Sequence, residues 1–187
     1  MKINRGLVAA LSCLLGAAGN AHEMPENRLT LVLRDETHLS LSYFVDYTEA
    51  LHQALAPKRT LQDFILVYSA MKQSDFEAAL TRAHAQLIVG TQLVLPKGEM
   101  LPTRNWQLPP PARARALLQE RTMQMLVGGD DHVHPAACEI RAEATSTRPI
   151  GSVSVRLPPE LGKVLLVSYQ PRQIWIEPRA ASIAIGF

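Results

Sequence analysis

The sequence predicts an α+β protein: an antiparallel β-sheet or small sandwich with three to four helices packed on it. Three observations support this class. Two runs near the N-terminus alternate apolar and polar residues, the middle of the chain carries apolar residues at helical spacing, and the second half returns to short alternating runs. No internal repeat or low-complexity segment interrupts this order.

The first two alternating runs predict a β-hairpin. Residues 28–36 alternate leucine with other residues, and residues 38–48 continue the period of two that places every second side chain on one face. Residues 35–37 supply the turn between them. A second hairpin is expected over residues 91–102, around a turn at residues 96–99.

Capping residues predict where three helices begin in the region that follows the first hairpin. Thr48 is expected to cap a short helix that ends before Pro57, and Thr60 to start the next one. Ser74 and Glu77 have the spacing of a capping box in front of a third, longer helix.

A fourth helix is predicted over residues 112–126, after the proline run at residues 109–111. Its spacing places Leu117, Leu118 and Met125 on the face toward the core and its arginines away from them.

Turn-forming residues divide the rest of the chain into short strands, which is typical of an antiparallel meander. The predicted strands lie within residues 138–146, 152–158, 163–171 and 172–178.

The first 21 residues have the layout of a secretory signal peptide. Lys2 and Arg5 precede an apolar run over residues 7–15, and small residues lead to Ala21. Cleavage after Ala21 makes His22 the first mature residue, with cleavage after Ala18 as the alternative. We therefore expect a periplasmic protein.

Residues 22–187 are then expected to form a single exported α+β domain. Its N-terminal hairpin and first helices would occupy residues 22–108, and the fourth helix and the meander residues 109–187.

Removal of the signal peptide leaves a chain without net charge. The precursor has 19 Lys and Arg against 17 Asp and Glu, and residues 1–21 contain two basic and no acidic residues, so 17 of each remain. Such a balance does not predict nucleic-acid binding. No second apolar run is long enough to predict a membrane span in the mature chain.

The sequence carries no familiar catalytic motif. It lacks a glycine-rich phosphate loop, a Gly-x-Ser-x-Gly elbow, a His-Glu-x-x-His pair and a Cys-x-x-Cys pair. A non-enzymatic function is therefore expected.

Potential metal ligands are concentrated near residues 123–138. His132 and His134 are two residues apart, so in extended backbone both imidazoles project from one face. Cys138 could add a thiolate and the pair Met123 and Met125 two thioethers, and this mixture of imidazole and sulfur suits copper.

Each of these ligands has a structural alternative. The histidines can be solvated residues of a polar loop. The two methionines can end a helix that packs into the core, and Cys138, the single cysteine of the mature chain, can be a small buried residue at the start of a strand.

A mature N-terminal histidine would add a further ligand. His22 could chelate one metal ion through its α-amino nitrogen and its imidazole together. This arrangement resembles the histidine brace of exported copper proteins such as the CopC-like and polysaccharide-oxidising families, and the resemblance covers this one residue. It implies a second histidine nearby, for which His38, His132 and His134 are the candidates. The alternative is a frayed N-terminus without a ligand role.

A second hypothesis comes from a different functional class. Trp106, Tyr169 and Trp175 lie near arginines, a combination that anchors protein partners, although each can also be a core residue. Residues 182–187 alternate apolar side chains and could add a strand to a sheet. We expect a structural or protein-interaction module that binds an unknown exported or envelope protein, with copper-type metal binding as the alternative. His52 and His84 lie on predicted helices and are expected to be surface or helix-face residues rather than ligands.

Overall fold

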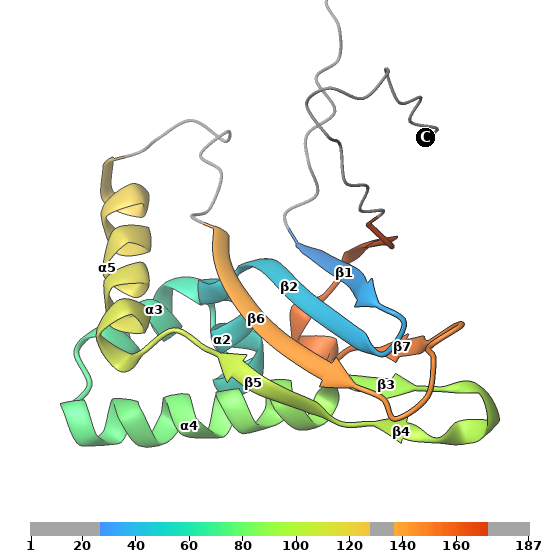
Figure 1. Ribbon diagram of the computed structural model, residues 1–187. Helices are drawn as coiled ribbons and strands as arrows, with labels where there is room; N and C mark the ends of the chain where they lie inside the picture. Colours follow the sequence, from blue (N-terminus) through green and yellow to red (C-terminus); the bar gives the residue numbers. More distant parts are fainter. Residues whose placement is uncertain (1–26, 128–136, 172–187) are drawn as a thin grey trace, which may run out of the picture.

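The computed structural model describes residues 27–127 and 137–171, and these form the α+β fold that the sequence predicts. A five-stranded sheet, called the large sheet below, and a three-stranded small sheet are combined with four α-helices (Figure 1). In chain order the elements are β1 (Arg28–Asp35), β2 (His38–Asp46), α2 (Tyr47–Leu55), α3 (Leu61–Ser69), α4 (Gln73–Gly90), β3 (Gln92–Val94), η1 (Pro96–Gly98), β4 (Met100–Leu101), β5 (Thr103–Gln107), α5 (Pro111–Val127), β6 (Ala137–Thr145), β7 (Ser154–Arg156), η2 (Pro159–Leu161) and β8 (Leu165–Tyr169).

Both predicted hairpins are confirmed. Strands β1 and β2 pair antiparallel, and Asp35 closes their turn by accepting hydrogen bonds from the backbone N–H groups of Thr37 and His38, both at 2.8 Å. Strands β3 and β4 form the second hairpin. Its turn contains Lys97 and Gly98 at positive φ (76° and 81°), a conformation that glycine adopts without strain.

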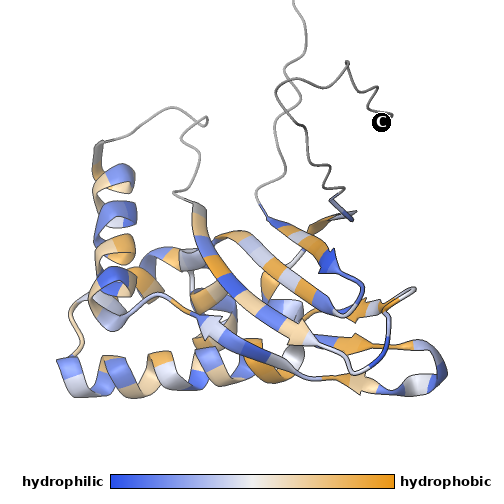
Figure 2. Ribbon diagram, viewed as in Figure 1, coloured by the Kyte–Doolittle hydropathy of each residue, from blue (hydrophilic) through white to orange (hydrophobic). Residues whose placement is uncertain are grey.

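One face of the large sheet forms the main core. Leu41 on β2 lies opposite Leu31 on β1 and Ala142 on β6, and all three are buried. The four helices, the small sheet and η2 contribute side chains to the same buried cluster. The residues between these buried positions point to the other face of the sheet, where Glu139 and Arg141 are exposed. Strands β2 and β6 therefore alternate in hydropathy along their length (Figure 2).

The predicted antiparallel meander is wrong for its three described strands. The large sheet has the order β5-β6-β2-β1-β8 and the small sheet the order β4-β3-β7, so β6, β7 and β8 do not pair with one another. Strand β6 pairs with β2, where buried Ile140 lies opposite buried Tyr43, and β8 runs parallel to β1. Burial against β2 explains the position of β6, because its Ile140, Ala142 and Ala144 are all buried there. Residues 172–178 lie outside the described residues.

The helix starts agree in part with the expected caps. Thr60 caps α3 by accepting from the Asp63 N–H at 3.1 Å, as predicted. Helix α2 begins earlier, because Asp46 takes the cap position and Thr48 is buried inside the first turn.

The predicted capping box in front of α4 is also wrong. The cap position belongs to Lys72, which makes no side-chain hydrogen bond there. The Glu77 carboxylate accepts a hydrogen bond instead from the Gln73 side-chain amide, within the first turn of the helix, at 2.6 Å.

Across the described residues, no helix combines the length and the apolar character needed to cross a bilayer.

Candidate functional site

The predicted metal ligands are only partly covered by the structure. His22, His132 and His134 lie outside the described residues. Met123 and Met125 lie on the last turns of α5, and Cys138 lies on β6. No group of three or more His, Cys, Asp or Glu side chains that could hold a metal ion occurs within residues 27–127 and 137–171.

Both methionines are exposed to solvent. Met123 is 60% exposed and Met125 42%, so the expectation that Met125 faces the core is wrong. Helical spacing does place it above Leu118, but the last turns of α5 extend away from the sheet and the other helices (Figure 1). Among the described elements, neither a sheet strand nor another helix lies beside these last turns. Successive helical residues are rotated by about 100°, so Met123 and Met125 point to opposite sides and do not form a pair on one face.

Cys138 is half-buried beside the core. It lies opposite Val45 on the neighbouring strand β2 and packs against the buried cluster. Burial raises the pKa of its thiol; the Arg113 guanidinium opposes this shift and the Glu139 carboxylate adds to it. The side chain is therefore a neutral thiol near pH 7, which suits packing better than metal coordination.

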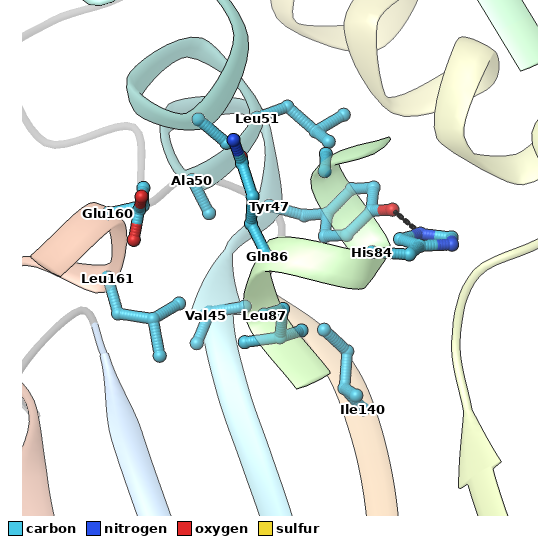
Figure 3. A pocket seen from close by; sticks show the side chains of 12 residues that line it. Val45, Tyr47, Ala50, Leu51, His84, Gln86, Leu87, Ile140, Glu160 and Leu161 are labelled. Carbon is cyan, nitrogen blue, oxygen red and sulfur yellow. Dashed lines mark hydrogen bonds between the residues drawn. The ribbon is translucent and has the colours of Figure 1, made fainter. Parts of the chain in front are cut away.

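A tyrosine–histidine pair lies beside a small cavity that the sequence did not reveal. The Tyr47 hydroxyl on α2 and His84 Nε2 on α4 are 2.6 Å apart (Figure 3). The cavity has an empty volume of about 370 Å³ that includes open solvent. Apolar side chains from α2, α4, β2, β6 and η2 form most of its wall, with His84, Gln86 and Glu160 as polar members (Figure 3).

Both members of this pair are neutral near pH 7. Burial raises the pKa of the Tyr47 hydroxyl, and Cys138 shifts it in the same direction. Burial lowers the pKa of His84, which is half-buried on a face of α4. His52, for which a surface or helix-face position was also expected, is buried on α2. In its Nδ1–H tautomer, a neutral imidazole accepts a hydrogen bond from the Tyr47 hydroxyl at Nε2. The pair joins α2 to α4 and carries no activated nucleophile.

This pair makes stability depend on pH. The unfolded chain protonates His84 as the pH falls through about 6.5, while the folded protein keeps it neutral to lower pH. We therefore expect the free energy of unfolding to be fully retained above pH 6.5 and to fall below it. His84→Gln retains an acceptor for Tyr47 but cannot titrate. Urea unfolding at several pH values between 5 and 8 should show a shallower decline for this variant; equal slopes would contradict the assignment.

Strand β8 leaves an uncharged apolar edge on the large sheet. It lies at one end of the strand order and pairs only with β1 among the described strands. All five of its residues are exposed, including Leu165 (42%), Leu166 (48%), Val167 (37%) and Tyr169 (54%). Exposed apolar edge strands pair readily with further strands, and folded proteins normally protect them with charges, bulges or shortness.

The other sheet edges in the described structure carry such protection. Strand β5, at the opposite end of the large sheet, has the charged Arg104 and a bulge that contains Asn105 at φ 54°. The small sheet ends in β4, which has two residues, and β7, which has three and includes Arg156. Strand β8 is the edge that lacks all three devices.

A groove lies along the inner side of β8. It has an empty volume of about 840 Å³ that includes open solvent. Leu31 on β1, Val153 before β7, and Leu166 and Ser168 on β8 are among its lining residues. Within residues 27–127 and 137–171, the gap between the two sheets is therefore open at the β8 side, where an added strand could bury side chains.

The three aromatic residues expected to anchor a partner have different positions. Trp106 is half-buried and stacks on the ring of Tyr43 with 6.0 Å between ring centroids, so it is part of the packed structure. Tyr169 is exposed on β8 and free to contact a partner. Trp175 lies outside the described residues.

Comparisons of the chain with protein-family models, with curated proteins and with solved structures found no match.

Proposed function

We propose that this chain is an exported, non-enzymatic interaction module of the periplasm that presents the β8 edge to an envelope partner. The signal-like N-terminus and the lack of catalytic motifs support export and a non-enzymatic role. The observation that carries the interaction is the contrast between edges: β5, β4 and β7 are charged, bulged or short, whereas β8 is neutral and apolar. Strand addition supplies backbone hydrogen bonds, and a groove for alternate side chains supplies specificity.

The partner segment that fits this edge is extended and uncharged, with apolar side chains at every second position. Its backbone would pair with β8, and one set of its side chains would enter the groove beside Leu166 and Ser168. A charged residue at an inward position would lose hydration without gaining an ionic partner, because the lining residues of the groove carry no charge.

Site-specific photo-crosslinking in the exporting cell tests this proposal. Benzoylphenylalanine at Val167 should yield a discrete crosslinked product, whereas the same group at Arg141, exposed on the open face of the sheet, should yield none. Peptide mass spectrometry should place the crosslink on an extended segment of an exported protein. Equal labelling from both positions, or none from Val167, would count against the proposed function.

Copper-type metal binding by residues 123–138 remains the second candidate. The exposure of Met123 and Met125 supports it: the two thioethers point to opposite sides of α5, but either one could serve as a single ligand, because neither is used in the core and both lie on the turns that precede His132 and His134. His132 and His134 would be the principal ligands, with Cys138 and His22 as further candidates.

Titration of the exported protein with Cu(I), Cu(II) and Zn(II) tests the metal proposal, with its first residue confirmed by intact mass. We expect stoichiometric binding that is lost in His132→Ala/His134→Ala and weakened at least several-fold in Met123→Ala/Met125→Ala. Met100→Ala is the matched control, since Met100 is 53% exposed on β4 at the far end of the molecule (Figure 1). Weak binding that none of these changes alters would exclude the site.

A further inference from the structure

The sequence of β8 is complementary to itself in antiparallel pairing. The strand reads Leu-Leu-Val-Ser-Tyr from Leu165 to Tyr169 and contains no charge that would repel an identical strand. Closed twofold dimers are the commonest oligomers, and in them one surface patch contacts its own copy. This inference rests on the proposed function and names the partner.

We propose that the segment added at β8 is β8 of a second copy of this chain, paired antiparallel about a twofold axis through Val167. The two large sheets then form one continuous sheet across the interface. Val167 lies opposite Val167 of the other copy, Leu165 opposite Tyr169, and Leu166 opposite Ser168. Aliphatic–aromatic and paired β-branched contacts of this kind stabilise cross-strand neighbours.

The inner side of the strand fits this register. Leu166 and Ser168 both line the groove next to β8. A twofold axis perpendicular to the sheet keeps each face on its own side, so Leu166 of the second copy enters the groove opposite Ser168. The small serine leaves room for the leucine, and the same contact occurs twice by symmetry.

The ends of the strand also tolerate this pairing. The register places Lys163, which precedes β8, opposite Pro171, which follows it, so like charges do not face each other at either end. Proline has no N–H to donate and therefore limits the pairing to the length of the strand itself.

Disulfide trapping and hydrodynamic measurement test the dimer and its register. In the exported chain with Cys138→Ala, Val167→Cys should form a disulfide-linked dimer, since opposed residues of an antiparallel pair have the Cα spacing that a disulfide needs. Thr145→Cys, exposed on β6, is the matched control and should stay monomeric. Without added cysteines, sedimentation should show a concentration-dependent dimer that Val167→Lys abolishes and Val167→Thr retains.

The photo-crosslink from Val167 separates this inference from the proposed function. A product of twice the chain mass, joined near Val167 in both copies, supports self-pairing. A monomer in sedimentation whose Val167 crosslinks to a different exported protein overturns self-pairing and leaves the proposed function standing. A crosslink to residues 172–187 of the same chain overturns both. A dimer without the Val167 disulfide overturns the register.

Discussion

Replacing Gly90 by valine is expected to lower the free energy of unfolding by about 1–3 kcal/mol, the usual cost of overpacking a filled site. Gly90 ends α4 against the start of η2. A Cβ atom at this position would lie 2.5 Å from Cβ of Pro158 and 3.2 Å from its Cα. The proline ring is rigid and Pro158 is buried, so the backbone of one element has to move. Urea unfolding monitored by circular dichroism measures the change.

The same substitution should also disturb the candidate interaction edge. Pro158 precedes η2, and the Leu161 carbonyl at the end of η2 accepts a hydrogen bond from the Asn27 side chain at 2.7 Å. Asn27 in turn accepts the backbone N–H of Leu165, the first residue of β8. Displacement of η2 is therefore transmitted to β8, and crosslinking from Val167 should weaken in Gly90→Val.

Gly151→Val is the matched control for Gly90→Val. Apart from Gly151 itself and its two chain neighbours, no residue comes within 4 Å of a Cβ built on Gly151, so we expect the free energy of unfolding to change by no more than about 0.5 kcal/mol. On a Pro158→Gly background the Gly90→Val penalty should shrink, because the obstructing ring is gone. An unchanged penalty in that double variant would show that the contact with Pro158 is not the cause.

Replacing Arg115 by alanine is expected to destabilise the protein by about 2–3 kcal/mol, since hydrogen bonds from charged groups contribute more than neutral ones. Arg115 was expected to point away from the core, but it is half-buried. One guanidinium nitrogen donates to the carbonyls of Ser69 and Met71, at 2.8 and 3.0 Å, and the group lies 4.4 Å from the ring centre of Phe76. It thus joins α5 to α4 and to the C-terminal end of α3. At that end of α3 a positive charge also interacts favourably with the helix dipole.

Arg113→Ala on the same helix is the control. Arg113 makes an ion pair with Glu120 in which both side chains are about half exposed, 51% and 45%. Such surface pairs contribute about 0–1 kcal/mol. The two variants measured side by side in thermal unfolding should therefore differ clearly, and similar losses would contradict the bridging role of Arg115. Arg115→Lys should recover part of the loss, because an ammonium group can reach one of the carbonyls but cannot stack as a plane.

Features that depend on neighbouring residues could be predicted from the sequence. The β1–β2 hairpin follows from alternation around a short turn, and the cap at Thr60 from one hydroxyl next to three free N–H groups. The burial of Leu117 and Leu118 follows from helical spacing. The exposure of Met125 does not, because spacing gives the direction of a side chain but cannot show that the helix extends beyond the surface it packs on.

The candidate site was less predictable because its parts are distant in sequence. Tyr47 and His84 are 37 residues apart, and their hydrogen bond depends on how α2 and α4 pack. Sequence patterns correctly placed a strand within residues 163–171, where β8 lies, but they could not show that it is an edge, since this depends on which strand pairs with β1. The metal hypothesis could be stated from the sequence alone, because His132 and His134 are only two residues apart, but both lie outside the described residues.

The sequence by itself determined the α+β class, the positions of most helices and strands, and the set of apolar residues available for a core. Those properties arise from backbone sterics and side-chain periodicity over a few residues, so they can be read locally. Only the tertiary structure decided the order of the strands, the position of the uncharged strand β8 at the end of the described large sheet, the inward position of Arg115 and the contact between Gly90 and Pro158. Each of these depends on which distant segments bury surface together, a choice made by the free energy of the whole core.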